Sequence, residues 1–199
     1  MQISGDGSIQ VYHKSKLILG VEKMPFPRVF GFLENFALDL GGSSGSLGSQ
    51  EDREIFTSEN HSAKIAPVIC YESVFGDYVN DYIRKGANMI FVITNDGWWK
   101  ETSGYFQHTR YSRLRAIETR RSIARAGNTG ITCVINTKGE MVQTANFWEQ
   151  AVLSEKVSIN EEFTFYTKSG DFLGRIMSFL AVLGIFYTIV ARLKQGELQ

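Results

Sequence analysis

Short apolar runs, each bounded by polar residues, recur along the chain and predict the strands of a sheet. Runs of about four to eight residues, rich in β-branched side chains, are typical of buried strands. The predicted strands cover residues 8–12, 65–69, 89–94, 131–135, 141–144 and 152–159. Two longer segments between these runs, residues 74–85 and 104–121, predict helices, so strands and helices are mixed along the chain.

The centre of the chain has the order strand, helix, strand within about thirty residues, which is typical of a βαβ unit. Residues 65–69 are its first strand, residues 74–85 its helix and residues 89–94 its second strand. Gly86 follows the helix, where a glycine commonly ends one. Polar and aromatic residues follow directly on both strands. The fold class predicted from this order is α/β.

The C-terminal region contains a run, residues 176–191, without any charged side chain. At 1.5 Å per residue such a run is a little shorter than the roughly 20 residues that a bilayer core requires. The flanking Arg175 and Arg192 can snorkel and make up the difference. We interpret the run as a transmembrane helix because it has no polar face, with a buried core helix as the alternative. The basic tail after it would face the cytoplasm, with the preceding domain on the other side.

A second apolar pattern occurs in residues 29–40. Phe32, Leu33, Phe36 and Leu40 recur there at helical spacing and predict a short amphipathic helix with an aromatic face. Such a face packs onto the core of the domain or contacts lipid, and the pattern is compatible with both.

Composition excludes some functions for a chain of 199 residues, a length that suits one domain of ordinary size. The 21 basic and 21 acidic side chains give a net charge of zero, which argues against bulk attraction to nucleic acid. Cysteines at positions 70 and 133 and histidines at positions 13, 61 and 108 have no metal-ligand spacing. A disulfide between Cys70 and Cys133 is left open by the sequence.

Cys70 is the candidate nucleophile because it follows directly on the strand at residues 65–69. Open α/β sheets place their reactive groups at the carboxyl ends of strands. A nearby base or cation makes a thiol reactive by favouring its thiolate, and Glu72 and Lys14 are the candidates for that environment. The alternative is that Cys70 is a small buried apolar residue, as we interpret Cys133.

Eight short motifs in one order carry a family resemblance. They lie at residues 12–14 (Tyr-His-Lys), 20–25, 69–72 (Ile-Cys-Tyr-Glu), 95–99 (Asn-Asp-Gly-Trp-Trp), 107–108, 113–118, 125–132 and 165–171. Together with the terminal apolar run they resemble the C-terminal portion of apolipoprotein N-acyltransferases. These are membrane-embedded members of the nitrilase (carbon–nitrogen hydrolase) superfamily. The resemblance covers essentially the whole chain and implies a nitrilase-like αββα sandwich followed by one transmembrane helix.

The resemblance also implies a site of the Glu-Lys-Cys type. Cys70 would be the nucleophile, Lys14 the cation that stabilises the tetrahedral oxyanion, and the backbone N–H of Tyr71 a second oxyanion donor. Glu22 and Glu72 correspond to two accessory acidic residues near the thiol. Either could orient Lys14, since an unpaired buried ammonium is costly. The charge of Lys14 would favour the thiolate and meet the developing oxyanion.

Aromatic residues would bind the substrate. Trp98 corresponds to an aromatic residue at the family's substrate entrance. The segment that contains Phe30, Phe32 and Phe36 would form the lip of a site that faces the membrane.

The implied reaction is a two-step transfer. An acyl chain passes from a phospholipid to Cys70 as a thioester, and then to the amine of a lipoprotein's N-terminal diacylglyceryl-cysteine. An amine accepts the acyl chain in preference to water where the site excludes water. The implied partners are thus phospholipid, lipoprotein and membrane, without nucleic acid, cofactor or metal. The implied location is the bacterial inner membrane, with the catalytic domain on its periplasmic face.

The sequence departs from the family's pattern in one respect. The family's general-base glutamate lies before the Tyr-x-Lys motif and after a bundle of membrane helices, and residues 1–10 supply neither. We therefore expect an N-terminally incomplete domain at residues 1–172, followed by the transmembrane helix and basic tail at residues 173–199. Two alternatives stay open: a nitrilase-family amidase in which water attacks the thioester, and a non-catalytic remnant that retains the fold.

Overall fold

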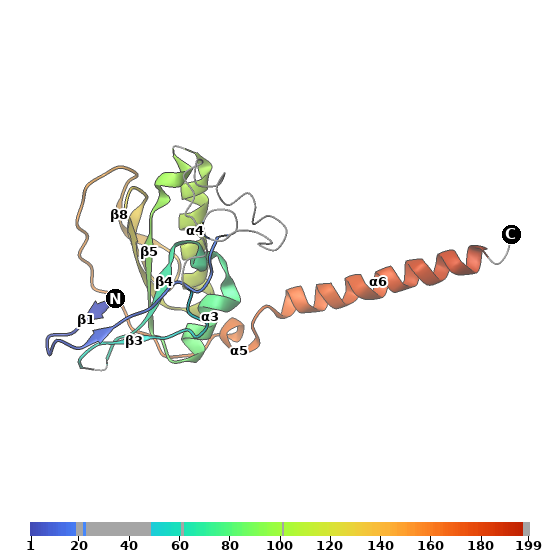
Figure 1. Ribbon diagram of the computed structural model, residues 1–199, viewed down its shortest axis with the longest axis horizontal. Coiled ribbons are helices and arrows are strands. Elements are labelled where there is room, and N and C mark those ends of the chain that lie inside the picture. The colour runs from blue at the N-terminus through green and yellow to red at the C-terminus, as the bar shows by residue number, and fades with distance from the viewer. Residues whose placement is uncertain (19–21, 23–48, 61, 101, 197–199) are drawn as a thin grey trace, which may run out of the picture.

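The main element of the structure is a six-stranded sheet (Figure 1). The structure is a computed structural model that describes residues 1–18, 22, 49–60, 62–100 and 102–196. The strands are ordered β3-β4-β5-β6-β7-β8 across the sheet. Their bounds are Phe56–Thr57 (β3), Lys64–Ile69 (β4), Met89–Thr94 (β5), Ser122–Gly127 (β6), Thr132–Ile135 (β7) and Met141–Ala145 (β8). A separate antiparallel pair consists of β1 (Gln2–Ile3) and β2 (Ile9–Gln10).

Helices connect the three parallel strands β4, β5 and β6. Helix α3 (Gly76–Arg84) connects β4 to β5, and helix α4 (Ser103–Thr119) connects β5 to β6. Such crossovers are needed because parallel strands run in the same direction. Short 3₁₀ turns precede the helices, η2 (Cys70–Val74) before α3 and η3 (Asp96–Trp99) before α4. The predicted βαβ unit and the α/β class are confirmed.

The core lies between the sheet and helices α3 and α4, which lie on the same side of the sheet (Figure 1). Along β5, Ile90 and Val92 are buried, whereas Ile93 is 56% exposed. Side chains alternate between the two faces of a strand, so the helices cover one face. The largest apolar side chains that are fully buried are Val68, Val79, Tyr82, Ile83, Ile90, Val92, Ile123 and Ile135.

The central strand β6 is not predicted by the pattern of apolar residues. Arg125 interrupts the apolar alternation of this segment, which is why its sequence does not look like a strand. In the structure Arg125 is nevertheless only 2% exposed. A buried charge of this kind is stable where it is paired and hydrogen-bonded, so a charged residue here marks an interior position.

The prediction of a strand at residues 152–159 is wrong. This segment has no regular secondary structure, and Val152 is 97% exposed. Where it meets the sheet, the hydroxyl of Ser122 donates to the carbonyl of Ser158 at 3.0 Å. Because this hydrogen bond comes from a side chain, it does not pair the segment with the sheet as a strand. The last strand of the sheet on this side is therefore β8.

The other predicted elements are present with shifted bounds. The strands at residues 131–135 and 141–144 are β7 and β8, and Asn136 N–H donates to the Glu140 carbonyl in the hairpin turn between them. The strand expected at residues 8–12 contracts to β2. The helix expected at residues 74–85 begins two residues later, because the 3₁₀ turn η2 occupies the first positions.

Helix α5 (Phe165–Ser169) is bound to α3 by side-chain bonds. The amide of Asn80 donates to the carbonyls of Tyr166 (3.2 Å) and Thr167 (3.3 Å), and Arg84 Nε donates to Thr167 at 2.9 Å. Asp171 N–H, two residues after the end of α5, donates to the carboxylate of Asp77 at 3.2 Å. The segment that precedes the last helix is therefore held directly on α3.

The last helix, α6 (Phe172–Gly196), extends away from the rest of the chain (Figure 1). Its apolar part lies within Phe172–Lys194, has a mean hydropathy of 2.0 and is not buried. At 1.5 Å per residue these residues span about 35 Å, against about 30 Å for a bilayer core. By length and composition α6 could cross a membrane, and none of the described residues covers it as a core would cover a buried helix. The amphipathic helix predicted at residues 29–40 lies outside the described residues.

Candidate active site

Cys70 lies at a sharp turn where β4 passes into the 3₁₀ turn η2. Its φ angle is +53°, in the left-handed region that a residue other than glycine seldom occupies. Such a conformation costs on the order of 1–3 kcal/mol and persists only where the surrounding structure imposes it. The side chain is half-buried at the carboxyl end of the strand. We refer to residues 69–73 as the Cys70 turn.

The carboxylate of Glu72 joins the Cys70 turn to the segment that carries Lys14. Glu72 is fully buried. Its Oε1 accepts hydrogen bonds from Ser15 N–H (2.7 Å), Tyr12 Oη (2.8 Å), Tyr78 Oη (3.0 Å) and Lys16 N–H (3.1 Å), and its Oε2 accepts from Ile69 N–H (2.8 Å). Two parts of the chain almost sixty residues apart in sequence thus share one acceptor.

Lys14 forms an ion pair with Glu22. Its Nζ lies 2.7 and 2.6 Å from the two carboxylate oxygens of Glu22, and the side chains are 11% and 21% exposed. The carboxylate also accepts from Ile18 N–H at 2.8 Å. Of the two acidic residues considered as partners of Lys14, Glu22 contacts the ammonium, whereas Glu72 holds the backbone of the next two residues.

Buried tyrosines complete the surroundings of Glu72. Tyr12 and Tyr78 hydroxyls lie 2.5 Å apart, and Tyr82 Oη is 3.3 Å from Tyr78 Oη. Burial raises the pKa of all three phenols above the usual value, so they stay neutral and act as donors. None of these three tyrosines has a role among the predictions from sequence. The position of Tyr12, two residues before Lys14, was the available signal.

A second buried network reaches Cys70 from α4. His108 Nδ1 lies 2.8 Å from Asp96 Oδ1, and Asp96 Oδ2 is paired with Arg125 Nη2 at 2.5 Å. His108 Nε2 lies 3.1 Å from the Cys70 carbonyl and 3.0 Å from Ser73 Oγ. Burial opposes the charge of Asp96, but the His108 hydrogen bond and the Arg125 charge outweigh it and lower its pKa.

The two cysteines differ in their surroundings, and both are free. Cys133, in β7, is 1% exposed, and burial raises the pKa of its thiol to about 11. The interpretation of Cys133 as a packing residue agrees with this burial, and the disulfide that the sequence left open is absent from the structure.

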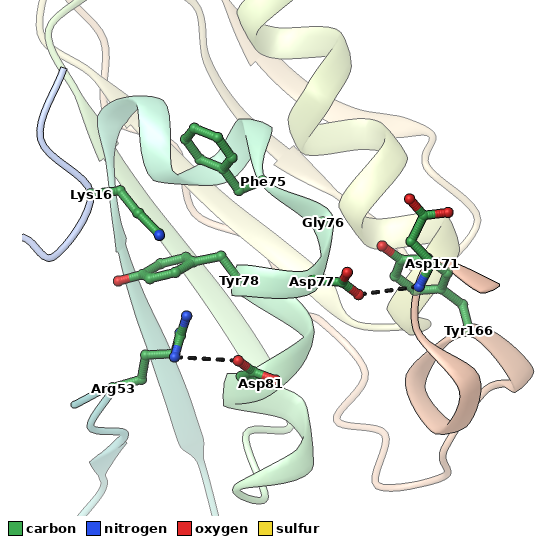
Figure 2. Close-up of a pocket in the computed structure, with 9 residues that line it drawn as sticks. All are labelled: Lys16, Arg53, Phe75, Gly76, Asp77, Tyr78, Asp81, Tyr166 and Asp171. Atoms are coloured by element: carbon green, nitrogen blue, oxygen red, sulfur yellow. Dashed lines mark hydrogen bonds and ion pairs between the residues drawn. The ribbon is translucent and has the colours of Figure 1, made fainter. Parts of the chain in front are cut away.

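A cavity of about 350 Å³ lies between Lys16, Arg53, the start of α3 and the segment from Tyr166 to Asp171, and Figure 2 shows the residues that line it. Tyr78 lies between Lys16 and Arg53, with the guanidinium carbon 4.3 Å from the ring centroid. Asp77 and Asp171 form the opposite wall. With charges of both signs, this cavity suits a polar group rather than a hydrocarbon chain. Among the described residues, no group of three or more His, Cys, Asp and Glu side chains could hold a metal ion.

The family follows from a comparison of the whole sequence with known protein families. Residues 1–161 match the model of the family described as carbon-nitrogen hydrolase. The chain belongs to the carbon-nitrogen hydrolase family. This confirms the resemblance drawn from the eight motifs, and the sheet with α3 and α4 is the carbon-nitrogen hydrolase fold carried by this chain.

Named relatives narrow the comparison within the carbon-nitrogen hydrolase family. The chain is 34% identical over 187 residues to the apolipoprotein N-acyltransferase of Chlorobaculum tepidum, covering 93% of this chain and 35% of that protein. It is 30% identical over 180 residues to the one of Thermotoga maritima, covering 89% and 34%. The chain therefore spans about a third of the length of these relatives. Saccharomyces cerevisiae Nit3, of the nitrilase superfamily, is a solved structure with a TM-score of 0.45, 19% identity and coverage of 53% and 41%.

The predicted site residues of this carbon-nitrogen hydrolase fall into two groups. The first comprises Lys14, Glu22, Cys70, Tyr71 and Glu72, all on the two segments that Glu72 joins. The second comprises the predicted substrate-binding residues Trp98, Phe30, Phe32 and Phe36. Trp98 belongs to η3, but its side chain and the three phenylalanines lie outside the described part of the chain. The predicted aromatic entrance therefore stays a prediction.

Replacing Glu72 by Gln should strongly destabilise the fold. A glutamine amide has one acceptor oxygen, so its NH₂ group would face the N–H of either Ile69 or Ser15. Leaving a buried donor unpaired costs about 1–3 kcal/mol. Chemical denaturation in detergent should show this loss for Glu72→Gln and none for the exposed Glu155→Gln. Equal stability of the two variants would show that the Glu72 hydrogen bonds are unimportant.

The Asp96 carboxylate should make stability depend on acid. Its folded pKa lies below the usual value, so its contribution is present above about pH 3.9 and is lost as the pH falls through the folded pKa. At about pH 6 Asp96→Asn should therefore be clearly less stable than the parent protein, and the gap should narrow as the pH falls below about 3.9 toward the folded pKa. A gap independent of pH would contradict this account.

Proposed function

We propose that this protein transfers an acyl chain from a phospholipid, through a thioester on Cys70, to the N-terminal amine of a diacylglyceryl-cysteine lipoprotein. Its relatives are named apolipoprotein N-acyltransferases, and it spans about a third of their length, so their reaction is a proposal for this chain. The observation that carries the proposal is the junction made by Glu72, which joins the Cys70 turn to the Lys14 segment.

In the first step, the thiolate of Cys70 attacks the carbonyl carbon of the phospholipid ester. The carbonyl oxygen becomes an oxyanion, which the Lys14 ammonium and the Tyr71 N–H stabilise. Tyr71 is suited to this role because an N–H in the first turn of a helix has no intrahelical acceptor. The ester C–O bond then breaks, and the proton that left the thiol goes to the departing lysophospholipid oxygen. The acyl chain is left on sulfur.

In the second step, the lipoprotein amine attacks the thioester. The C–S bond breaks, an amide forms, and the proton released by the amine returns to the Cys70 thiolate. Exclusion of water favours the amine over hydrolysis. The Glu22 carboxylate keeps the Lys14 ammonium in place through both steps, since it binds that group at both oxygens.

The general base is a separate part of the proposal. The family resemblance implies a glutamate before Lys14, and no glutamate precedes Glu22 in this sequence. We therefore assign the base to none of these residues. A small external base should then accelerate acylation of Cys70.

The proposed setting is the bacterial inner membrane, with residues 1–172 on its periplasmic face and residues 173–199 as the anchor. The helix α6 supports this, because it is long, apolar and unburied. The basic residues Arg192 and Lys194 follow its apolar part and favour a cytoplasmic C-terminus.

Intact mass measurement tests the reaction. The protein in detergent is mixed with vesicles of one phospholipid of known acyl mass, with and without imidazole as external base. One acyl mass should appear on the Cys70 peptide, and Cys70→Ala should abolish it. Lys14→Met should slow it by about 10²- to 10³-fold, as loss of an oxyanion donor does. The exposed Lys156→Met is the matched control and should have no effect.

Other outcomes of this measurement would refute the transferase. Absence of the adduct, together with hydrolysis of a small amide, would favour the amidase alternative. Absence of both reactions would favour the non-catalytic remnant. An adduct on Cys133 would show that the wrong thiol had been assigned.

The proposed anchor has its own test. Deletion of residues 176–199 should release the protein from membranes washed at high salt, because an apolar helix resists salt whereas ionic contacts do not. The control is the parent chain, which should stay in the pellet. Retention of the shortened protein would place the anchor elsewhere, for instance in residues 29–40.

A further inference from the structure

The carbonyl oxygen of Cys70 is held by two buried side chains. Ser73 Oγ donates to it at 2.9 Å, and His108 Nε2 lies 3.1 Å from it. A carbonyl can only accept, so this contact is a hydrogen bond when His108 Nε2 carries a proton. Ser73 is fully buried and His108 is 3% exposed, which shields both bonds from water.

The ring of His108 is fixed from its other side. Nδ1 lies 2.8 Å from the carboxylate of Asp96, which also accepts from Thr94 Oγ1 at 2.9 Å. Arg125 holds that carboxylate and is held in turn by Ser112 Oγ at 3.1 Å. The chain of contacts runs from β6 through η3 and α4 to the Cys70 turn, and its members are all buried.

One peptide group connects this network to the Tyr71 N–H. The Cys70 carbonyl and the Tyr71 N–H belong to the same planar trans peptide, so they point in opposite directions. Side chains that hold the carbonyl toward the interior therefore aim the Tyr71 N–H outward. The same contacts hold Cys70 at φ +53°, a conformation that needs support from its surroundings.

We propose that His108, with Ser73 and Asp96, is a positioning residue that orients the Cys70–Tyr71 peptide so that the Tyr71 N–H meets the oxyanion. This inference rests on the proposed function, because it takes Cys70 as the nucleophile. It concerns residues that do not touch the substrate and act through the peptide between them and the thiol.

A purely structural role is the competing explanation, since a buried network also stabilises a fold. The two roles differ in one measurable ratio. Acylation of Cys70 by an ester passes through an oxyanion, whereas alkylation by iodoacetamide does not. A misdirected Tyr71 N–H should slow acylation while leaving alkylation almost unchanged.

The experiment compares these two rates at Cys70 on the full chain in detergent. The ester probe is p-nitrophenyl acetate, followed by p-nitrophenolate release and by the acetyl mass on the Cys70 peptide, with Cys70→Ala as background. Labelling of the buried Cys133 reports unfolding in each variant. His108→Phe removes the donor, and His108→Gln retains a donor near the position of Nε2.

The matched control for lost stability is Arg121→Met. Arg121 is 1% exposed and donates to the carbonyls of Ala87, Thr119 and Glu162, away from the Cys70 turn. Its loss should destabilise the fold without changing the ratio of the two rates.

The proposal expects His108→Phe to lower the ratio of acylation to alkylation by about ten- to a hundredfold, a partial loss of an oxyanion donor. His108→Gln should restore most of the ratio, and Ser73→Ala should lower it less. An unchanged ratio in His108→Phe would overturn the proposal. If His108→Phe exposes Cys133, Ser73→Ala decides in its place, and an unchanged ratio there overturns it. Absence of Cys70 acetylation in the parent protein would instead refute the proposed nucleophile.

Discussion

The buried carboxylate of Glu72 is the interaction on which the arrangement of the site depends. It accepts five hydrogen bonds, four at one oxygen, from groups that belong to two distant parts of the chain. Burying a carboxylate is costly unless donors surround it, so the segments have to meet for the fold to be stable. Stability and the placement of the segment that carries Lys14 next to the Cys70 turn are therefore consequences of the same contact.

Two carboxylates near the site have different tasks that their environments explain. Glu22 is partly exposed and binds the Lys14 ammonium directly, with one further bond to the backbone. Glu72 has no exposed surface and binds mainly backbone N–H groups and phenols. The first controls the position of a charge, and the second controls the path of the backbone. Because the neutral tyrosines remain donors, the Glu72 arrangement needs no cation within it.

Much of the fold could be predicted because its signals are local. Buried strands such as β4 and β5 are continuous apolar runs, and the apolar helix α6 shows its character by composition alone. The prediction was wrong where tertiary contacts decide. The strand β6 contains Arg125, whose burial depends on Asp96 and Ser112 from other elements. Residues 152–159 have the residue pattern of a strand but pair with no strand of the sheet. The site residues came from motifs, whereas the Asp96–His108–Ser73 contacts join positions that only the folded chain brings together.

The docking of α5 onto α3 has a further consequence for a protein anchored by α6. The Cys70 turn leads directly into α3, α5 is hydrogen-bonded to α3, and only two residues separate α5 from α6. In the proposed membrane setting, these connections fix the height of the thiol above the bilayer plane. The enzyme would then select its ester by depth: a bond at the level of the glycerol backbone comes within reach, and a bond deeper or higher does not.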